Sequence, residues 1–268
     1  LAALLAPGLD TVWERTTSAG GGPFDPGFSH LAAADVNGDG RCETLAARHG
    51  NRLACVAPEG EILWETELGE KSRWRPVGVV SGRPTAFRHA GLDWIAVGCF
   101  AGDLVVCDAG NGEIVSRTRF GTDAHGDALR RRRVPSFLRR ALAGTGEPVC
   151  GILALGDTLI FGCSDGHVYA LRGRDGTRLW SFDTPGSVSE RPVRLGLTGS
   201  GARAVVVWDE EGVVLLDVAT GRALRGLPSL PGGDGASDVL AVDLNGDGRR
   251  DLIVAVPGRR EVAAWVRR

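Results

Sequence analysis

Short apolar runs separated by turns recur along this chain at nearly regular spacing. The clearest copy covers residues 158–184, where two apolar runs meet at Asp165-Gly166, a turn follows at Asp175-Gly176, and a third run carries Trp180. Short apolar runs bounded by Asp and Gly are typical of β-strands. Weaker copies of the same plan span residues 45–68, 95–120, 205–227 and 252–268. The pattern predicts an all-β protein built from repeated antiparallel units.

The copy at 158–184 resembles the PQQ-like repeat of quinoproteins and of outer-membrane assembly propellers, in which a run of this form makes three strands of one blade. The resemblance covers nearly the whole chain and implies a β-propeller of four-stranded antiparallel blades. The outer-strand position recurs at Trp13, Trp64, Ser116, Trp180 and Arg225. Because five such positions occur, we expect a five-bladed β-propeller.

The last copy of the repeat stops after two strands. Its missing outer strand is matched by residues 9–17 at the other end of the chain, where Trp13 stands in a setting like that of Trp64. We therefore expect the N-terminal strand to close the C-terminal blade, because ring closure removes the exposed edges of a sheet. The expected single domain is 1–268, with blades at about 28–69, 72–120, 147–184, 189–228 and 236–268.

The innermost strand of each blade is expected near a matched step in the sequence. The steps are Arg75-Pro76-Val77, Glu147-Pro148-Val149 and Arg191-Pro192-Val193, with His30-Leu31 and Asp238-Val239 in the first and last blades. Proline is tolerated at the first residue of a strand because it removes no interior ladder bond. In a propeller these residues would surround one mouth of the central channel.

An insertion at residues 121–147 separates the second and third expected blades. It contains the basic run Arg130, Arg131, Arg132 and Arg133. The following residues, 135–144, read as a short helix with proline early and glycine at its end. This basic insertion is either a docking site for an acidic partner or a solvated helix that covers the blade junction.

Two nine-residue segments, 35–43 and 243–251, carry oxygen-bearing side chains at positions 1, 3, 5 and 9 and glycines at positions 4 and 6. Calcium prefers oxygen ligands, which a tight loop can supply from alternate side chains and from the carbonyl of position 7. The predicted ligands are the side chains of Asp35, Asn37, Asp39 and Glu43 with the Arg41 carbonyl, and the side chains of Asp243, Asn245, Asp247 and Asp251 with the Arg249 carbonyl.

These loops are not EF-hands, because Ala46 and Val254 stand where an EF-hand needs its last glutamate. Their flanks are short apolar runs that are typical of buried strands. The strand, loop and strand arrangement resembles the FG-GAP repeats of integrin-type β-propellers, which implies two calcium ions with a structural role. The alternative is a pair of Asn-Gly and Asp-Gly turns that bind nothing.

Charge and composition narrow the range of partners. The formal net charge of -2 does not indicate a polyanion binder, and the aromatic residues fall in the expected blade strands, so nucleic acid is not an expected partner. No apolar run reaches eighteen residues, so we expect no membrane span. The six cysteines lack zinc-site spacing, and Cys99 and Cys163, at one repeat position, are expected to be buried thiols rather than a disulfide.

A ligand or partner surface is expected at the mouth of the channel. The candidates are His30, Trp74, Arg75, Arg191 and Asp238, together with Arg130, Arg131, Arg132 and Arg133. An arginine beside a tryptophan can hold a carboxylate or a sugar ring. Salt bridges among Arg75, Glu147 and Arg191 are the alternative explanation of these charges.

The sequence contains no recognisable catalytic constellation, since its five histidines share no motif with a serine or a metal-ligand pattern. Quinoprotein dehydrogenases as a family use an eight-bladed ring, and many stack the cofactor on a vicinal disulfide, so we expect no PQQ here. The sequence favours a non-catalytic, calcium-stabilised scaffold for protein interaction or ligand binding, acting in a larger assembly. Because calcium sites suit such compartments, we expect an extracellular, periplasmic or cell-surface location. A calcium-dependent polysaccharide lyase or another glycan-processing enzyme, with carbohydrate as its ligand, is the alternative.

Overall fold

The computed structural model describes twelve segments of the protein. They are residues 28–48, 51–69, 80–99, 102–120, 149–163, 165–184, 188, 191–196, 203–209, 212–224, 238–256 and 260–266. Within these segments, eighteen strands form five antiparallel sheets. The expected all-β class with four-stranded antiparallel sheets is confirmed, and the number of sheets equals the number of expected blades.

Three of the sheets contain four strands each, which follow one another in chain order across the sheet. Their strands are β1 (Phe28–Ala34), β2 (Glu43–Arg48), β3 (Arg52–Val56) and β4 (Ile62–Glu67); β5 (Thr85–His89), β6 (Leu92–Gly98), β7 (Asp103–Asp108) and β8 (Ile114–Arg119); and β9 (Val149–Leu155), β10 (Thr158–Cys163), β11 (His167–Arg172) and β12 (Arg178–Asp183). The other two sheets have three strands among the described residues. These are β13 (Val193–Gly196), β14 (Arg203–Asp209) and β15 (Gly212–Asp217), and β16 (Asp238–Val242), β17 (Asp251–Val256) and β18 (Glu261–Trp265).

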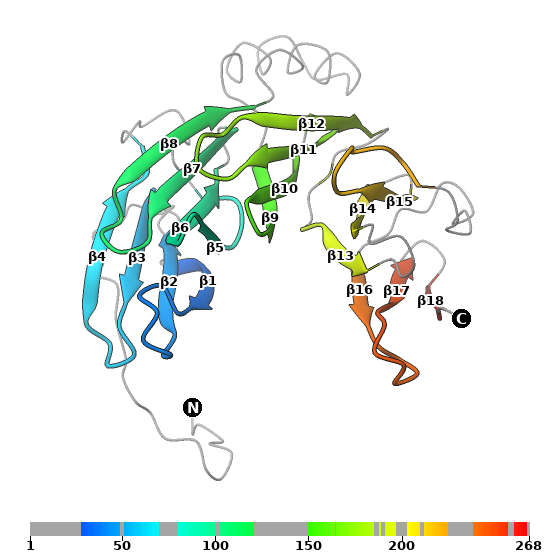
Figure 1. The fold of residues 1–268 in the computed structure, drawn as a ribbon, viewed down its shortest axis with the longest axis horizontal. Helices are drawn as coiled ribbons and strands as arrows, with labels where there is room; N and C mark the ends of the chain where they lie inside the picture. The colour runs from blue at the N-terminus through cyan, green and yellow to red at the C-terminus, as the bar shows by residue number, and fades with distance from the viewer. Residues whose placement is uncertain are drawn as a thin grey trace.

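The sheets follow one another along an open arc, with β1, β5, β9, β13 and β16 on its inner side (Figure 1). This corrects the expected closed ring, in which the first and last blades would be neighbours. In the structure the sheet of β1 to β4 and the sheet of β16 to β18 lie at opposite ends of the arc. The last sheet ends at β18, and no fourth strand joins it within the described residues. The expected closing strand, residues 9–17 with Trp13, lies outside them.

The core consists of separate layers between successive sheets rather than one central mass. The first layer joins Leu45 and Leu53 of the first sheet to Ile95 and Val105 of the second, and three similar clusters fill the next three interfaces. Interior strands such as β10 are buried at nearly every position, whereas outer strands such as β8 alternate between half-buried and exposed side chains. Burial of a side chain the size of Phe161 contributes about 1.5 to 3 kcal/mol. The three middle sheets are therefore fixed by two neighbours each, and the first and last sheets by one.

The tryptophans of the outer strands lock one sheet to the next. The indole N–H of Trp64 donates to the Ala109 carbonyl at 2.9 Å, and that of Trp180 donates to the Val218 carbonyl at 2.8 Å. In each case a glycine with positive φ lies under the indole, Gly112 in the first contact, and a Cβ atom there would collide with the ring. The recurring tryptophan that marks the repeat is thus an inter-sheet contact.

The expected starts of the innermost strands are found at Val149 and Val193, where β9 and β13 begin. The second sheet differs, because its innermost strand is β5, preceded by an isolated bridge between Val80 and Cys99. The expected step at residues 75–77 and the basic insertion at 121–147 lie outside the described residues. The expected boundaries of the blades near these two segments therefore stay predictions. In the part of the chain that the structure describes, no helix has the length and apolar character needed to cross a membrane.

Candidate functional site

The first candidate loop connects β1 to β2 and is organised by the carboxylate of Asp35. One oxygen of Asp35 accepts the backbone N–H groups of Gly38 at 2.7 Å and Asp39 at 3.2 Å, and the other accepts that of Gly40 at 2.9 Å. Both glycines have positive φ, of 77° and 86°, a region that other residues rarely adopt. The spacing of aspartate and glycine therefore produces a chain wrapped around one carboxylate.

The second candidate loop connects β16 to β17 and repeats this geometry. Asp243 accepts the N–H groups of Gly246 at 2.7 Å, Asp247 at 3.2 Å and Gly248 at 2.8 Å. These hydrogen bonds to Gly248 and its neighbours lower the pKa of the Asp243 carboxyl. Asp35 and Asp243 thus accept the same three backbone N–H groups although the two loops lie at opposite ends of the arc (Figure 1).

The acidic residue at position 9 closes each loop from the interior. Glu43 is buried, and one of its oxygens accepts the N–H of Val36 at 2.9 Å. Asp251 is also buried and accepts the N–H of Leu244 at 2.9 Å. A glutamate and an aspartate thus make the same contact to the second residue of the loop.

The donor set of both loops suits a hard cation, because its side chains end in carboxylate or amide oxygens. The described atoms, however, satisfy each other by hydrogen bonds. In the first loop Asn37 Nδ2 donates to Asp39 Oδ2 at 3.1 Å and lies 3.4 Å from Glu43 Oε1. No group of three His, Cys, Asp or Glu side chains suited to a metal ion occurs within the described residues. Calcium binding through Asp35 to Glu43 and Asp243 to Asp251 stays a prediction.

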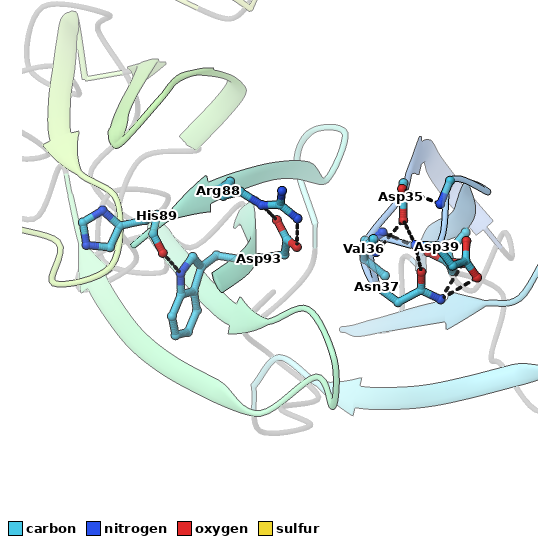
Figure 2. A network of polar contacts seen from close by, with 11 residues as sticks. Asp35, Val36, Asn37, Asp39, Arg88, His89 and Asp93 are labelled. Carbon is cyan, nitrogen blue, oxygen red and sulfur yellow. Dashed lines mark hydrogen bonds and ion pairs between the residues drawn. The ribbon is translucent and has the colours of Figure 1, made fainter. Parts of the chain in front are cut away.

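The two loops differ in what lies beside them. Arg88 of β5 donates to Asp93 of β6 through Nε at 2.8 Å and Nη2 at 2.6 Å. The same Nη2 lies 3.9 Å from the position that a Cβ atom would take at Gly38, and the charge of Asp35 contributes to a raised pKa of Arg88, after the larger contribution of Asp93. Figure 2 draws the Arg88 and Asp93 pair together with the loop. At the corresponding position of Gly246, no atom of the described residues lies within 4 Å.

Sequence reasoning missed Arg88, because it comes from the next repeat and carries no motif of its own. Asp93 carries no recognisable motif either. The contact between this pair and the first loop depends on how the second sheet packs against the first, which no local pattern specifies.

The predicted ligand surface is described only in part. His30 lies near the start of β1 and Asp238 at the start of β16, so both stand at the edge of the arc opposite the candidate loops. Arg191 lies two residues before β13 at the same edge and is exposed. The remaining candidates lie outside the described residues: Trp74, Arg75, Arg130, Arg131, Arg132 and Arg133. Their shared site stays a prediction.

Acidic residues at the turns between interior strands have structural partners. Asp103 is fully buried and binds Arg119 at 2.7 and 3.0 Å and Arg117 at 3.2 Å. Asp165 accepts the Tyr169 hydroxyl at 2.7 Å, and burial together with this hydrogen bond raises the pKa of that hydroxyl. These carboxylates fix hairpins rather than present reactive groups.

The cysteines behave as small core residues. Cys99 and Cys163 are both buried, as the sequence predicts, and Cys55 and Cys107 are buried as well. Burial raises the pKa of Cys99 to about 12. By contrast, Cys42 in the first loop is exposed.

Comparison with known proteins supports the repeat. A family model described as outer membrane protein assembly factor BamB matches residues 49–268. A comparison with curated protein sequences finds no match.

Solved structures share the fold at low sequence identity. The BBS1N structure in complex with ARL6DN has a TM-score of 0.57 and 12% identity, and the match covers 88% of this chain and 64% of that one. The computationally designed protein Ika8 has a TM-score of 0.57 and 15% identity, over 90% and 58% of the two chains. Sqt1 from Saccharomyces cerevisiae has a TM-score of 0.52 and 13% identity, over 67% and 43%. This chain therefore spans about three fifths of the length of the first two structures.

Proposed function

We propose that this chain, which belongs to the PQQ-like repeat family described as outer membrane protein assembly factor BamB, acts as a non-catalytic scaffold for protein interaction. The family description names an assembly factor, and by analogy we assign this chain a partner protein or a larger assembly. Propellers host many unrelated activities, so the assignment depends on surfaces of this chain.

The observation that carries the proposal is the exposed apolar face of the last sheet. Side chains at alternate positions of β16, β17 and β18 pack toward the fourth sheet, including Val239, Leu252 and Val254. Leu240, Ile253, Ala255 and Val262 stand at intervening positions, face the other way and are apolar too. Leu240 is 56% exposed and Val262 is 73% exposed.

This face is continuous across the sheet. Leu240 pairs with Ile253 and Ala255 pairs with Val262, so apolar side chains of three strands stand side by side. A contiguous exposed apolar area on a soluble protein commonly marks an interaction surface. We assign it to an apolar surface of a partner protein, because Leu240, Ile253, Ala255 and Val262 offer no charge to recognise a sugar acid or a nucleic acid.

We further propose that each candidate loop holds one calcium ion. The ligands would be Asp35, Asn37, Asp39, Glu43 and the Arg41 carbonyl in the first loop, and the corresponding residues of the second. Support comes from the matched backbone of the two loops and from their oxygen-rich donors. A bound ion would offset repulsion among the carboxylates and add stability to the folded state alone.

The location that fits this proposal is outside the cytoplasm, as a periplasmic, extracellular or cell-surface protein. It is supported by the family description, which refers to the outer membrane, and by the calcium proposal. No observation within the described residues favours the alternative of a glycan-processing enzyme.

Site-specific photo-crosslinking tests the scaffold. A photoreactive phenylalanine analogue is placed at Leu240 or at Val262 of the full chain, and at Leu179 of β12 as a control that is 43% exposed. We expect crosslinks to one partner protein from the first two positions and none from the third. Equal crosslinking at all three positions, or product formation when the purified protein meets an acidic polysaccharide, would contradict the proposal.

A further inference from the structure

Two arginines from different sheets lie beside one stretch of β9, on the inner side of the arc. Arg83 lies just before β5 in the second sheet, and Arg191 lies just before β13 in the fourth. Both residues are exposed. They flank β9, the innermost strand of the third sheet.

The segment that carries Arg83 is fixed along β9 by side chains on either side of it. The Ser81 hydroxyl donates to the Val149 carbonyl, and the Thr85 hydroxyl donates to the Ile152 carbonyl at 3.1 Å. Arg83 therefore lies between two points of attachment, beside the middle of this stretch of β9. Its backbone position is set by the fold and not by its own side chain.

Arg191 approaches the same stretch of β9 from the other side. A Cβ atom added at Gly151 would lie 2.5 Å from Arg191 Cβ and 2.8 Å from its Cα. The glycine is thus required for this close approach, because any side chain there would push the Arg191 backbone away. Arg83 and Arg191, from the second and fourth sheets, are therefore both placed beside the same stretch of β9 in the third.

The charges of this pair are not neutralised within the described residues. Arg88, Arg117 and Arg119 each bind a carboxylate, whereas no ion pair or hydrogen bond joins Arg83 or Arg191 to a described acidic residue. Arg191 is partly surrounded by protein atoms but still reaches solvent. This partial burial is the larger cause of a lowered pKa of Arg191, and the positive charge of Arg83 is the smaller one. Arginine nevertheless stays charged, so the pair repels itself.

We propose that Arg83 and Arg191 form a binding site for an oxyanion, a carboxylate or a phosphate group, on the inner wall of the arc. The planar guanidinium group presents paired N–H donors that match the two oxygens of such a group. A bound anion would also relieve the repulsion between the arginines. This site rests neither on the calcium loops nor on the apolar face of the last sheet, and it adds Arg83 to a surface for which the sequence indicated Arg191.

Inorganic phosphate and citrate, titrated calorimetrically in a low-chloride buffer at neutral pH, are the probes. We expect saturable binding of at least one of them to the wild-type protein. Arg83→Gln and Arg191→Gln are each expected to weaken it about tenfold or more, since each removes one charged hydrogen-bonding partner, and the double variant is expected to abolish it. Arg194→Gln, which removes an exposed arginine of β13, is the matched control and should bind like wild type.

The variant Gly151→Ala is a second test of the oxyanion site, and it keeps both arginines. The added methyl group should displace Arg191 and weaken the same binding. Arg83→Gln should also raise the unfolding temperature in buffer free of both anions, because it removes the repulsion, whereas Arg194→Gln should not.

Each result of the titrations has a distinct meaning for the proposed site. Binding of citrate alone identifies a carboxylate ligand, and binding of phosphate alone identifies a phosphate. Phosphate also stabilises many proteins by exclusion from their surface, so equal stabilisation of the wild type and the double variant, without saturable heat, overturns the site. Absence of binding by both probes overturns it as well and leaves the crosslinking test of the scaffold unaffected.

Discussion

The loops at the two ends of the arc have the same interior and different surroundings. Asp35 and Asp243 each gather three backbone N–H groups over the same spacing. The first loop lies beside the Arg88 and Asp93 pair of the next sheet, and Arg41 forms an ion pair with Glu59. The last loop belongs to the sheet at the other end of the arc, where no described atom lies within 4 Å of a Cβ position at Gly246, the counterpart of Gly38.

This difference separates what nine residues do by themselves from what the fold adds. The hydrogen bonds around the first aspartate are local, so they are the same in both copies. The environment of each loop depends on the neighbouring sheet, and among the described residues only the first loop has a side chain of that sheet beside its first glycine. Properties that depend on the loop interior should therefore match, and properties that depend on neighbours should differ.

Calcium provides the largest expected effect and tests the shared interior. At a free concentration about one hundred times Kd, each site should add about 2.7 kcal/mol to the free energy of unfolding. Thermal melts with calcium and with a chelator measure this stabilisation, and Asp35→Ala and Asp243→Ala should each remove about half of it. If the chelator does not move the midpoint of the wild type, the loops are turns that bind no calcium.

Removal of the buried acid at position 9 should cost a different amount of stability in each loop. Glu43→Ala leaves the N–H of Val36, a buried residue, without its acceptor, at a cost of about 1 to 3 kcal/mol. Asp251→Ala exposes the N–H of Leu244, a residue that is 47% exposed and to which water has access, so the cost should be smaller. Chemical denaturation in the presence of a chelator measures both.

The isosteric changes Glu43→Gln and Asp251→Asn are the controls, because they keep an oxygen acceptor at each position. A larger loss for Asp251→Ala than for Glu43→Ala would show that the terminal loop is the more tightly packed of the two, against the arrangement described here.

Strands, turns and the wrapped loops were predictable because their causes are local. Apolar runs bounded by glycine turns predicted the strands, and the glycines at positions 4 and 6 predicted a tight loop. The sequence placed a cation at the centre of that loop, and the hydrogen bonds to the Asp35 carboxylate came only from the structure. Trp64 and Trp180 marked the repeat, although their role as links between sheets needed the positions of Ala109 and Val218.

What the sequence could not specify depends on contacts between repeats. The expected ring closure followed from the similarity between residues 9–17 and the outer strands. Similarity in sequence, however, does not determine which sheet edge a strand pairs with. Arg88 and Arg83 carry no pattern of their own, and each matters only because another sheet places it beside a loop or a second arginine. Such pairings arise from packing between sheets distant in sequence.

Arg88 should distinguish the affinities of the two loops for calcium. Its positive charge beside Gly38 disfavours a cation, and its removal leaves the negative charge of Asp93 nearby. In an Asp243→Ala background, Arg88→Gln should tighten calcium binding by about two- to fivefold, a range set by the weak interactions of exposed charges. Asp93→Asn should shift the affinity in the opposite direction. Calorimetric titration measures both variants, and unchanged affinities would mean that the pair does not influence the loop.

Thiol labelling should give the smallest effect and compares the mobility of the two loops directly. Cys42 occupies position 8 of the first loop, and Arg250 occupies the same position of the second; both are exposed. Without calcium, a cysteine introduced by Arg250→Cys in a Cys42→Ser background should react with iodoacetamide a few-fold faster than Cys42, because the second loop lacks the neighbours that restrain the first. Calcium should slow both reactions. Equal rates without calcium would show that the two loops are equally mobile.

The buried Cys55 supplies the internal reference for this experiment. Burial, followed by the charge of Glu43, raises its pKa to about 11, so it is protonated and shielded at pH 8. Because the folded-state pKa is raised above the ordinary value near 8.5, the stability linked to this thiol is complete below that value and falls as the pH rises toward 11. Peptide mapping should find Cys42 alkylated and Cys55 intact at pH 8. Early alkylation of Cys55 would show that the first sheet opens before its loop does, and the comparison of the loops would then report local unfolding instead of loop mobility.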